Sequence, residues 1–113
     1  MIKNLNVGVV GCGYWGPNLI RNFNGLPDCN LKLVCDMDVA RLKHMKSLYP
    51  AVETETNFDH MLNGAGLDAV VIATSVNTHF KMAKASLLAG KHVFIEKPMA
   101  TSSGECEELI DLA

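Results

Sequence analysis

The sequence predicts an α/β fold with a doubly wound parallel sheet, and three observations support this. Short apolar, β-rich segments alternate five times with helical segments along the 113 residues. The connections between them are short, and this order is typical of βαβ crossovers, which build a parallel sheet with helices on both faces. A glycine-rich turn at residues 11–16 joins the first strand to the first helix. We therefore expect a single domain of this architecture, residues 1–113.

The first strand–helix unit is bounded by an apolar run and by glycines. Residues 5–10 form a short β-rich run that ends at Gly11, as a buried strand does. A helical pattern follows over about residues 15–24, and Gly25 ends it. The side chains expected on its inner face are Leu19, Ile20 and Phe23.

The second unit begins with an apolar strand at residues 31–35, which is closed by Asp36. Asp38 is suited to cap a helix running to about residue 48, because its carboxylate can accept hydrogen bonds from the first free N–H groups. The side chains expected on the inner face of this helix are Leu42, Met45 and Leu48.

Three more units complete the alternation. The expected strands lie at 51–54, 68–73 and 92–96, and the expected helices at 57–64, 78–88 and 106–113. Gly90 is placed to end the helix before it, and Ser102 and Glu105 have the spacing of a capping box for the last helix. A doubly wound dinucleotide fold normally has six strands, so the five counted here predict a truncated sheet.

Charge and hydropathy exclude several classes of partner. The net charge is −2 and no cluster of Lys or Arg is present, which argues against nucleic acid and anionic membranes. No apolar stretch approaches the roughly 20 residues that span a bilayer, and no signal peptide is evident. We therefore expect a cytoplasmic protein. Its four cysteines lack the spacing of a metal site, which predicts reduced, mostly buried thiols and no bound metal.

The turn at residues 11–16 has the Gly-x-Gly-x-x-Gly spacing of a dinucleotide-binding site. Gly11 allows the tight turn, Gly13 lets the backbone approach a pyrophosphate, and Gly16 lets the helix pack closely on the strand. The free N–H groups of the first helical turn then bind the phosphates. The bulky residues of the turn, which either shield the pyrophosphate or pack against a further domain, are Tyr14 and Trp15.

Asp36 lies 20 residues after Gly16, at the carboxyl end of the second strand. An acidic group at this place accepts hydrogen bonds from the adenosine ribose and repels a 2′-phosphate, which predicts NAD in preference to NADP. Two alternatives stay open. In the first, Asp36 only caps the following turn. In the second, Arg41, one helical turn away, reaches a 2′-phosphate and weakens the preference for NAD.

Two further segments follow strands at the same edge of the expected sheet, where the nicotinamide would lie. Lys97 is a cation placed there, suited to acid–base steps at a substrate hydroxyl. Without further information Lys97 and Glu96 also fit a solvated charge pair. His79 fits either a cofactor contact or an ordinary half-buried histidine. The candidate cofactor-binding residues in these segments are Thr74, Ser75, His79, Glu96 and Lys97.

Taken together, these segments resemble the amino-terminal domain of the glucose–fructose oxidoreductase / inositol dehydrogenase (Gfo/Idh/MocA) family. The matching residues are 7–16, Asp36, 68–74, His79 and 89–98. The Glu-Lys-Pro segment at 96–98, after an Ala-Gly-Lys-His strand entry, is far more specific than the glycine motif. Ser75 departs from the family, which usually has proline there.

The resemblance implies a Rossmann fold and hydride transfer between NAD(P) and a hydroxyl carbon of a sugar, nucleotide sugar or cyclitol, with Lys97 near the reacting carbon. It also implies a second domain that holds the substrate pocket and the surface for a homo-oligomer. That domain is absent from residues 1–113, so we expect these residues to bind the cofactor without turnover. The rivals are a stand-alone dinucleotide-sensing module and, more weakly, a domain that binds S-adenosylmethionine.

Overall fold

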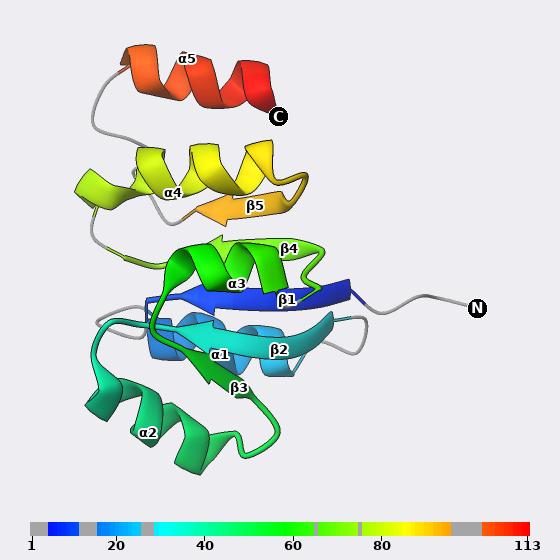
Figure 1. The fold of residues 1–113 in the computed structure, drawn as a ribbon, viewed down its shortest axis with the longest axis vertical. Coiled ribbons are helices and arrows are strands. Elements are labelled where there is room, and N and C mark those ends of the chain that lie inside the picture. The colour runs from blue at the N-terminus through cyan, green and yellow to red at the C-terminus, as the bar shows by residue number, and fades with distance from the viewer. Residues whose placement is uncertain (1–4, 12–15, 26–28, 65, 75, 96–102) are drawn as a thin grey trace.

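The computed structural model describes residues 5–11, 16–25, 29–64, 66–74, 76–95 and 103–113. Strands and helices alternate throughout, in the order that the sequence predicts (Figure 1). The elements are β1 (Leu5–Val10), α1 (Gly16–Asn24), β2 (Cys29–Cys35), α2 (Val39–Leu48), β3 (Glu53–Glu55), α3 (Phe58–Gly64), β4 (Ala69–Ile72), α4 (Val76–Leu88), β5 (His92–Ile95) and α5 (Ser103–Leu112).

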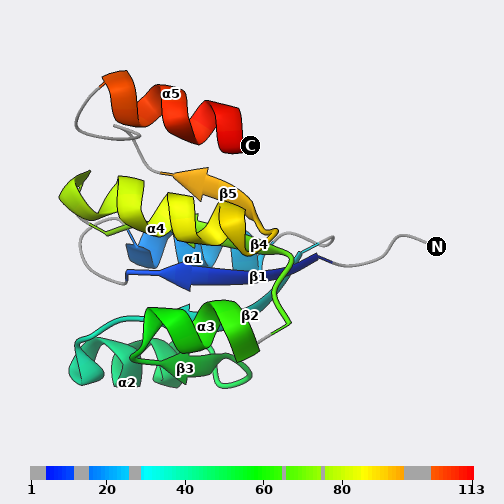
Figure 2. The same ribbon diagram turned by 45° about the horizontal axis from the view of Figure 1, so that its top comes forward.

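All strand pairs are parallel, and they form one sheet in the order β3-β2-β1-β4-β5. The chain therefore moves outward from the central β1 to β3, then crosses back to β4 on the other side of β1. Figures 1 and 2 show α1 behind the sheet and α3 and α4 in front of it. The predicted fold class, a doubly wound parallel sheet, is confirmed.

Neighbouring residues of a strand point to opposite faces of the sheet. Because consecutive residues of the inner strands are apolar, both faces of the sheet are apolar. In β4, Val70 and Ile72 belong to the core beneath α3, α4 and α5, while Val71 belongs to the core beneath α1 and α2. All three side chains are at most 1% exposed. On the α1 side, Ile20 is fully buried, and the predicted partners Leu19 and Phe23 pack against the same core.

Two helix ends were correctly located from single residues. Asp38 caps α2, and its Oδ1 accepts hydrogen bonds from the N–H groups of Ala40 (3.0 Å) and Arg41 (3.3 Å). Gly90 follows α4 with φ of 79°. Its N–H donates to the Leu87 carbonyl, and the N–H of the next residue donates to the Ser86 carbonyl, each at 3.0 Å. This bonding is that of a Schellman C-cap, which a left-handed glycine permits.

Other predictions need correction. The third strand lies at Glu53–Glu55 and not at 51–54, because its partner in β2 is Leu33–Cys35. Helix α4 begins two residues earlier than the predicted 78. Leu48 was predicted to be buried but is 54% exposed. The helical period of 3.6 residues brings Tyr49, seven positions after Leu42, to the inner face instead, and Tyr49 packs against the core.

Helix α5 packs on α4 at the edge of the sheet next to β5 (Figure 1). Leu109 is 3% exposed and belongs to the same core as Ala83 of α4, whereas the adjacent Ile110 is 63% exposed. Lys84 Nζ and Glu108 Oε1 add an ion pair of 2.7 Å between the two helices. In the part of the chain that the structure describes, no helix combines the length and apolarity needed to cross a membrane.

The packing of α5 on α4 predicts that two neighbouring substitutions lower the free energy of unfolding by different amounts. Leu109→Ala should lower the free energy of unfolding by about 2–3 kcal/mol, because it removes a buried side chain and leaves a cavity. Ile110→Ala should change it by less than about 0.5 kcal/mol. Urea unfolding followed by circular dichroism measures both, and equal costs would contradict the docking of α5 through Leu109.

Candidate functional site

The strands end together along one edge of the sheet. In each pair of neighbouring strands, the last residue of one lies opposite the last residue of the other. From β3 to β5, these residues are Glu55, Cys35, Val10, Ile72 and Ile95. The residues that follow the strands therefore meet at this edge. The chain path reverses between β1 and β4, and ligands of open α/β sheets bind at such a switch point, outside the carboxyl ends of the strands.

Gly11 lies at this switch point and is buried. Its N–H donates to the Cys35 carbonyl at 2.8 Å, and its φ is 97°. A Cβ at this position would lie 2.8 Å from the carbonyl oxygen of Ala73 and 2.9 Å from Cγ2 of Thr74. Both the backbone conformation and the closeness of the β4–α4 connection therefore require glycine.

Helix α1 starts at the same edge, because it follows β1, which ends there. Gly16 is its first residue. The N–H groups of its first turn have no helical partners and carry the positive end of the helix dipole, which suits a phosphate. The other residues predicted to line the turn lie outside the described residues, and their roles stay predictions. They are Gly13, Tyr14 and Trp15.

Asp36 directly follows β2 and is half-buried. Its Oδ1 accepts a hydrogen bond of 2.8 Å from the Asp38 N–H, and its own N–H donates to the Glu55 carbonyl at 3.1 Å. The side chain therefore does stabilise the turn into α2, as one alternative held. A carboxylate has about four acceptor sites, so this bond is compatible with a second role toward a ribose.

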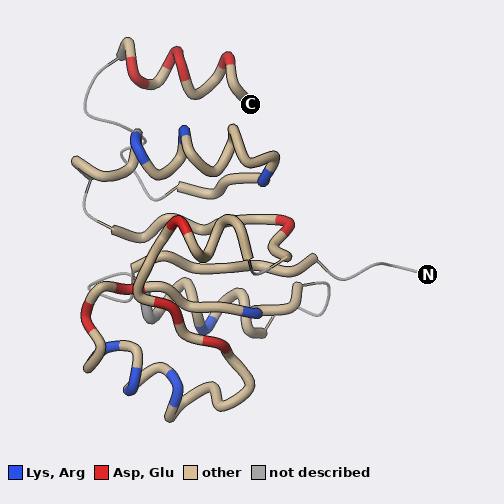
Figure 3. Tube along the Cα trace, in the orientation of Figure 1, with Lys and Arg blue, Asp and Glu red and all other residues tan. Residues whose placement is uncertain are grey.

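Arg41 does not extend freely toward this site. Its Nε lies 3.6 Å from Asp38 Oδ2, and both side chains are about half exposed, at 55% and 48%. Figure 3 shows acidic positions gathered where β2 and β3 end, and basic positions farther along α2. Formal charges at the carboxyl end of β2 are thus mostly negative.

Burial, and to a smaller extent the nearby carboxylates of Glu55 and Asp36, together raise the pKa of the Cys35 thiol to about 12. The thiol is 2% exposed and stays protonated at neutral pH. Cys29 and Cys106 are partly exposed, so the expectation of mostly buried thiols holds, among the described cysteines, only for Cys35. Across the described residues, no cluster of three His, Cys, Asp or Glu side chains is arranged to bind a metal.

The β4–α4 connection is held by side chains of α4. The His79 ring is 2% exposed, and its Nε2 lies 2.8 Å from the carbonyl oxygen of Thr74. Thr74 Oγ1 lies 2.6 Å from Thr78 Oγ1 and donates to Met82 Sδ at 3.6 Å. Of the predicted residues, the structure thus brings Gly11, Thr74 and His79 together. Thr78 and Met82 also belong to this group, although no motif in the sequence predicts it.

The remaining predicted residues, Ser75, Glu96 and Lys97, lie outside the described residues. Their roles stay predictions.

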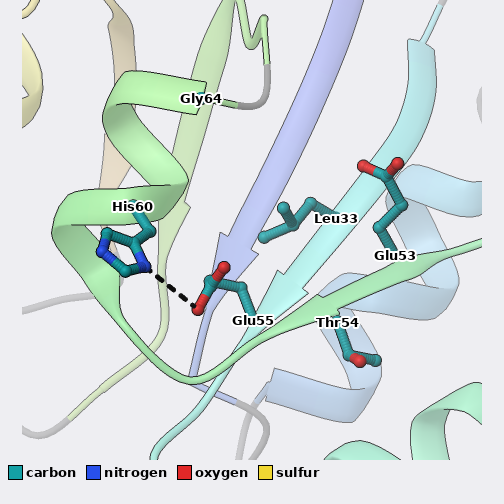
Figure 4. Close-up of a pocket in the computed structure, with 6 residues that line it drawn as sticks. All are labelled: Leu33, Glu53, Thr54, Glu55, His60 and Gly64. Carbon is teal, nitrogen blue, oxygen red and sulfur yellow. Dashed lines mark ion pairs between the residues drawn. The ribbon is translucent and has the colours of Figure 1, made fainter.

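A hollow of about 550 Å³ lies beside β3 (Figure 4). Its lining comes from β2, β3 and α3, and consists of Leu33, Glu53, Thr54, Glu55, His60 and Gly64. Glu55 Oε1 accepts hydrogen bonds from the N–H groups of Thr56 and Asn57, each at 3.0 Å, and lies 3.9 Å from His60 Nδ1. These contacts stabilise the β3–α3 turn, and the hollow lies apart from the switch point between β1 and β4.

The strand order and the glycine at the switch point define a Rossmann-type dinucleotide-binding domain. Residues 5–113 match the family model GFO_IDH_MocA, described as an oxidoreductase family with an NAD-binding Rossmann fold. The chain belongs to this family.

Known relatives are longer than this chain. The oxidoreductase YdgJ of Escherichia coli K12 is 33% identical over 114 residues, which cover 100% of the chain and 32% of YdgJ. A glycosyl hydrolase family 109 protein of Shewanella amazonensis is 33% identical over 121 residues, which cover 99% of the chain and 27% of that protein. The chain thus spans about a third of these relatives or less.

A solved structure shares the fold closely. Scyllo-inositol dehydrogenase from Lactobacillus casei, with bound NAD(H) and scyllo-inositol, superposes with a TM-score of 0.89 at 29% identity. The match covers 97% of this chain and 33% of that one. Fold neighbours include complexes with NADP as well as with NAD(H).

The pKa of Cys35 predicts a loss of stability at alkaline pH. Because the folded chain binds the thiol proton up to about pH 12 and an ordinary thiol loses it near 9.0, stability is fully present below pH 9.0 and falls as the pH rises toward 12. Urea unfolding over a pH series measures the slope. Cys35→Ala should make the slope shallower, and Cys29→Ala, on the same strand, should not. An unchanged slope in Cys35→Ala contradicts the assignment.

Proposed function

We propose that this chain is the cofactor-binding domain of an NAD-dependent oxidoreductase. The enzyme would transfer a hydride between the nicotinamide and a hydroxyl carbon of a sugar, nucleotide sugar or cyclitol. One observation carries the proposal: buried Gly11 and the carboxylate of Asp36 follow neighbouring strands at the same edge of the sheet, in a chain that belongs to this family. The bound scyllo-inositol of the dehydrogenase described above supports the substrate class.

In this proposal each strand end binds one part of the cofactor. The pyrophosphate lies over the turn at residues 11–16 and the amino end of α1, where N–H groups and the helix dipole stabilise its charge. The adenosine ribose lies against Asp36. The nicotinamide extends across the switch point toward Thr74 and residues 96–98. The bound cofactor supplies the hydride acceptor or donor for the reaction.

Two charges support NAD over NADP. The carboxylate of Asp36 accepts hydrogen bonds from ribose hydroxyls but repels a 2′-phosphate. Arg41 is the nearest described cation along α2, and its ion pair with Asp38 offsets its charge. The local field therefore favours the dinucleotide without the extra phosphate.

Substrate chemistry requires residues beyond this domain. We propose that the whole enzyme is a cytoplasmic homo-oligomer, with a second domain that supplies the substrate pocket and the subunit interface. Within the present chain, Lys97 is the proposed catalytic residue. It would hydrogen-bond the reacting hydroxyl and take up its proton as the hydride leaves the same carbon.

Binding of NADH, and its weakening by Asp36→Ala, tests the proposal. The 113-residue chain should bind NADH with a dissociation constant of roughly micromolar to millimolar size, the range usual for such ligands. Asp36→Ala should weaken NADH binding about tenfold and NADPH binding less, because only NADH depends on a charged hydrogen bond to the ribose. Titration followed by NADH fluorescence or calorimetry measures both constants.

Two further variants separate charge from local structure. Asp36→Asn retains the oxygen that accepts the Asp38 N–H and removes the charge, so it should reduce the preference for NADH without destabilising the turn. Asp38→Ser retains a helix cap and should leave NADH binding unchanged. A folded chain that binds neither dinucleotide refutes the proposal, and equal losses for both in Asp36→Ala remove Asp36 from the ribose role.

The role of Lys97 predicts a defect in turnover and not in cofactor binding. In the longer enzyme that contains this domain, Lys97→Met should lower kcat by about 10²–10⁴-fold, the usual contribution of a positioned acid–base group. The dissociation constant for NADH should stay nearly constant. Lys91→Met is the matched control, because Lys91 precedes β5 and lies at the opposite edge of the sheet. Equal kcat in the Lys97 variant and the parent would rule out this role.

A further inference from the structure

His79 is a polar side chain in the interior of a mostly apolar core. It lies in the first turn of α4, and its ring is 2% exposed. Burying a polar ring costs free energy unless hydrogen bonds compensate, so the ring's position at this edge of the sheet calls for an explanation. A ligand at the switch point has almost no exposed ring surface to contact.

The hydrogen bond from His79 is directed at the β4–α4 connection. Its partner, the carbonyl oxygen of Thr74, can only accept, so the proton lies on Nε2, which donates across 2.8 Å. The side chain of Thr74 is held by the same helix, through the 2.6 Å contact between its Oγ1 and Thr78 Oγ1. Helix α4 therefore binds both the backbone and the side chain of Thr74.

Thr74 in turn limits the position of Gly11. Its Cγ2 lies 2.9 Å from the point that a Cβ of Gly11 would occupy, with the carbonyl of Ala73 2.8 Å from that point. The N–H of Ala73 also donates to the Val10 carbonyl at 2.9 Å. The first residue of the glycine turn thus packs directly against a connection whose position His79 fixes. A shift of Thr74 would therefore change the packing of Gly11, from which the glycine-rich turn begins.

We propose that His79 is a positioning residue for dinucleotide binding, which acts through Thr74 on the Gly11 turn without touching the cofactor. This inference rests on the proposed function, since it concerns the same site. It differs from a direct cofactor contact, which needs exposed ring atoms. It also differs from a purely structural histidine, whose loss would lower stability and leave the affinity for NADH unchanged.

Two substitutions of His79 separate these roles. The Gln amide nitrogen can reach the place of Nε2, whereas the shorter Asn side chain places its amide near Nδ1 and leaves the Thr74 carbonyl without its donor. His79→Asn should weaken NADH binding by about tenfold, as expected when a buried acceptor loses its partner. His79→Gln should stay within about threefold of the parent chain, because it retains that hydrogen bond.

Ser86→Ala serves as the matched control in the same helix. Ser86 is fully buried, and its hydroxyl donates at 2.8 Å to the backbone carbonyl of Met82, and not to the Met82 sulfur that Thr74 contacts. This variant should retain the NADH affinity of the parent chain, because it removes neither tether of Thr74. Amide NMR spectra give a second readout, in which His79→Asn should shift the resonances of Gly11 and Thr74 and Ser86→Ala should not.

The outcomes are distinct. Weak binding in His79→Asn with rescue in His79→Gln supports the proposal. The proposal is overturned if both variants bind NADH as tightly as the parent chain does. It is also overturned if both variants lose the same amount of NADH affinity. If His79→Asn does not fold, Thr78→Val removes the other tether of Thr74, and an unchanged affinity in that variant overturns the proposal too. A parent chain that binds no NADH refutes the proposed function instead.

Discussion

The close approach of the Gly11 backbone to the β4–α4 connection is the constraint on which the rest of the site depends. The two segments are more than 60 residues apart in the chain but lie within van der Waals contact. This contact exists because β1 and β4 pair in parallel and end in the same row. A side chain larger than hydrogen at position 11 would force these strand ends apart, because its Cβ would lie within 2.9 Å of Ala73 and Thr74.

The same row of strand ends explains why residues of different segments lie at one edge of the sheet. Pairing of β1 with β2 places Asp36 one strand away from Gly11, and pairing of β2 with β3 anchors the Asp36 N–H on the Glu55 carbonyl. The apolar cores on both faces hold the strands in this register. Fold stability and site geometry therefore have a common cause, the register of a sheet that is buried on both sides.

Local signals in the sequence predicted most of the fold, and long-range packing decided the rest. Alternating apolar segments located the described strands and helices. Asp38 begins α2 and Gly90 ends α4 through local hydrogen bonds, which the residue type at each position predicts. The bounds of the third strand depended on its partner in β2, which no local pattern encodes. Leu48 was misplaced because a spacing of three residues drifts from the helical period, and Tyr49 occupies the inner face.

The candidate site, like the fold, was predictable where it depends on local spacing and not where it depends on long-range packing. Gly11 and Asp36 have fixed spacings from a strand, so their arrival at one edge follows from topology. The burial of His79 and its bond to Thr74 depend on how α4 packs, so the sequence left its role undecided. The hydroxyl pair of Thr74 and Thr78 gave only one weak signal, a spacing of four residues across a helix start.

The hydrogen bond between the Asp36 carboxylate and the Asp38 N–H links the proposed choice of dinucleotide to the local folding of the chain. The acceptor that would recognise a ribose also shapes the turn that leads into α2. A change of cofactor preference at this position is therefore never a change of charge alone, because any replacement must still accept that N–H or reshape the turn. Asn and Ser meet this requirement, whereas long basic side chains do not. If the proposed preference for NAD holds, a substitution at position 36 that admits NADP must also preserve the turn into α2.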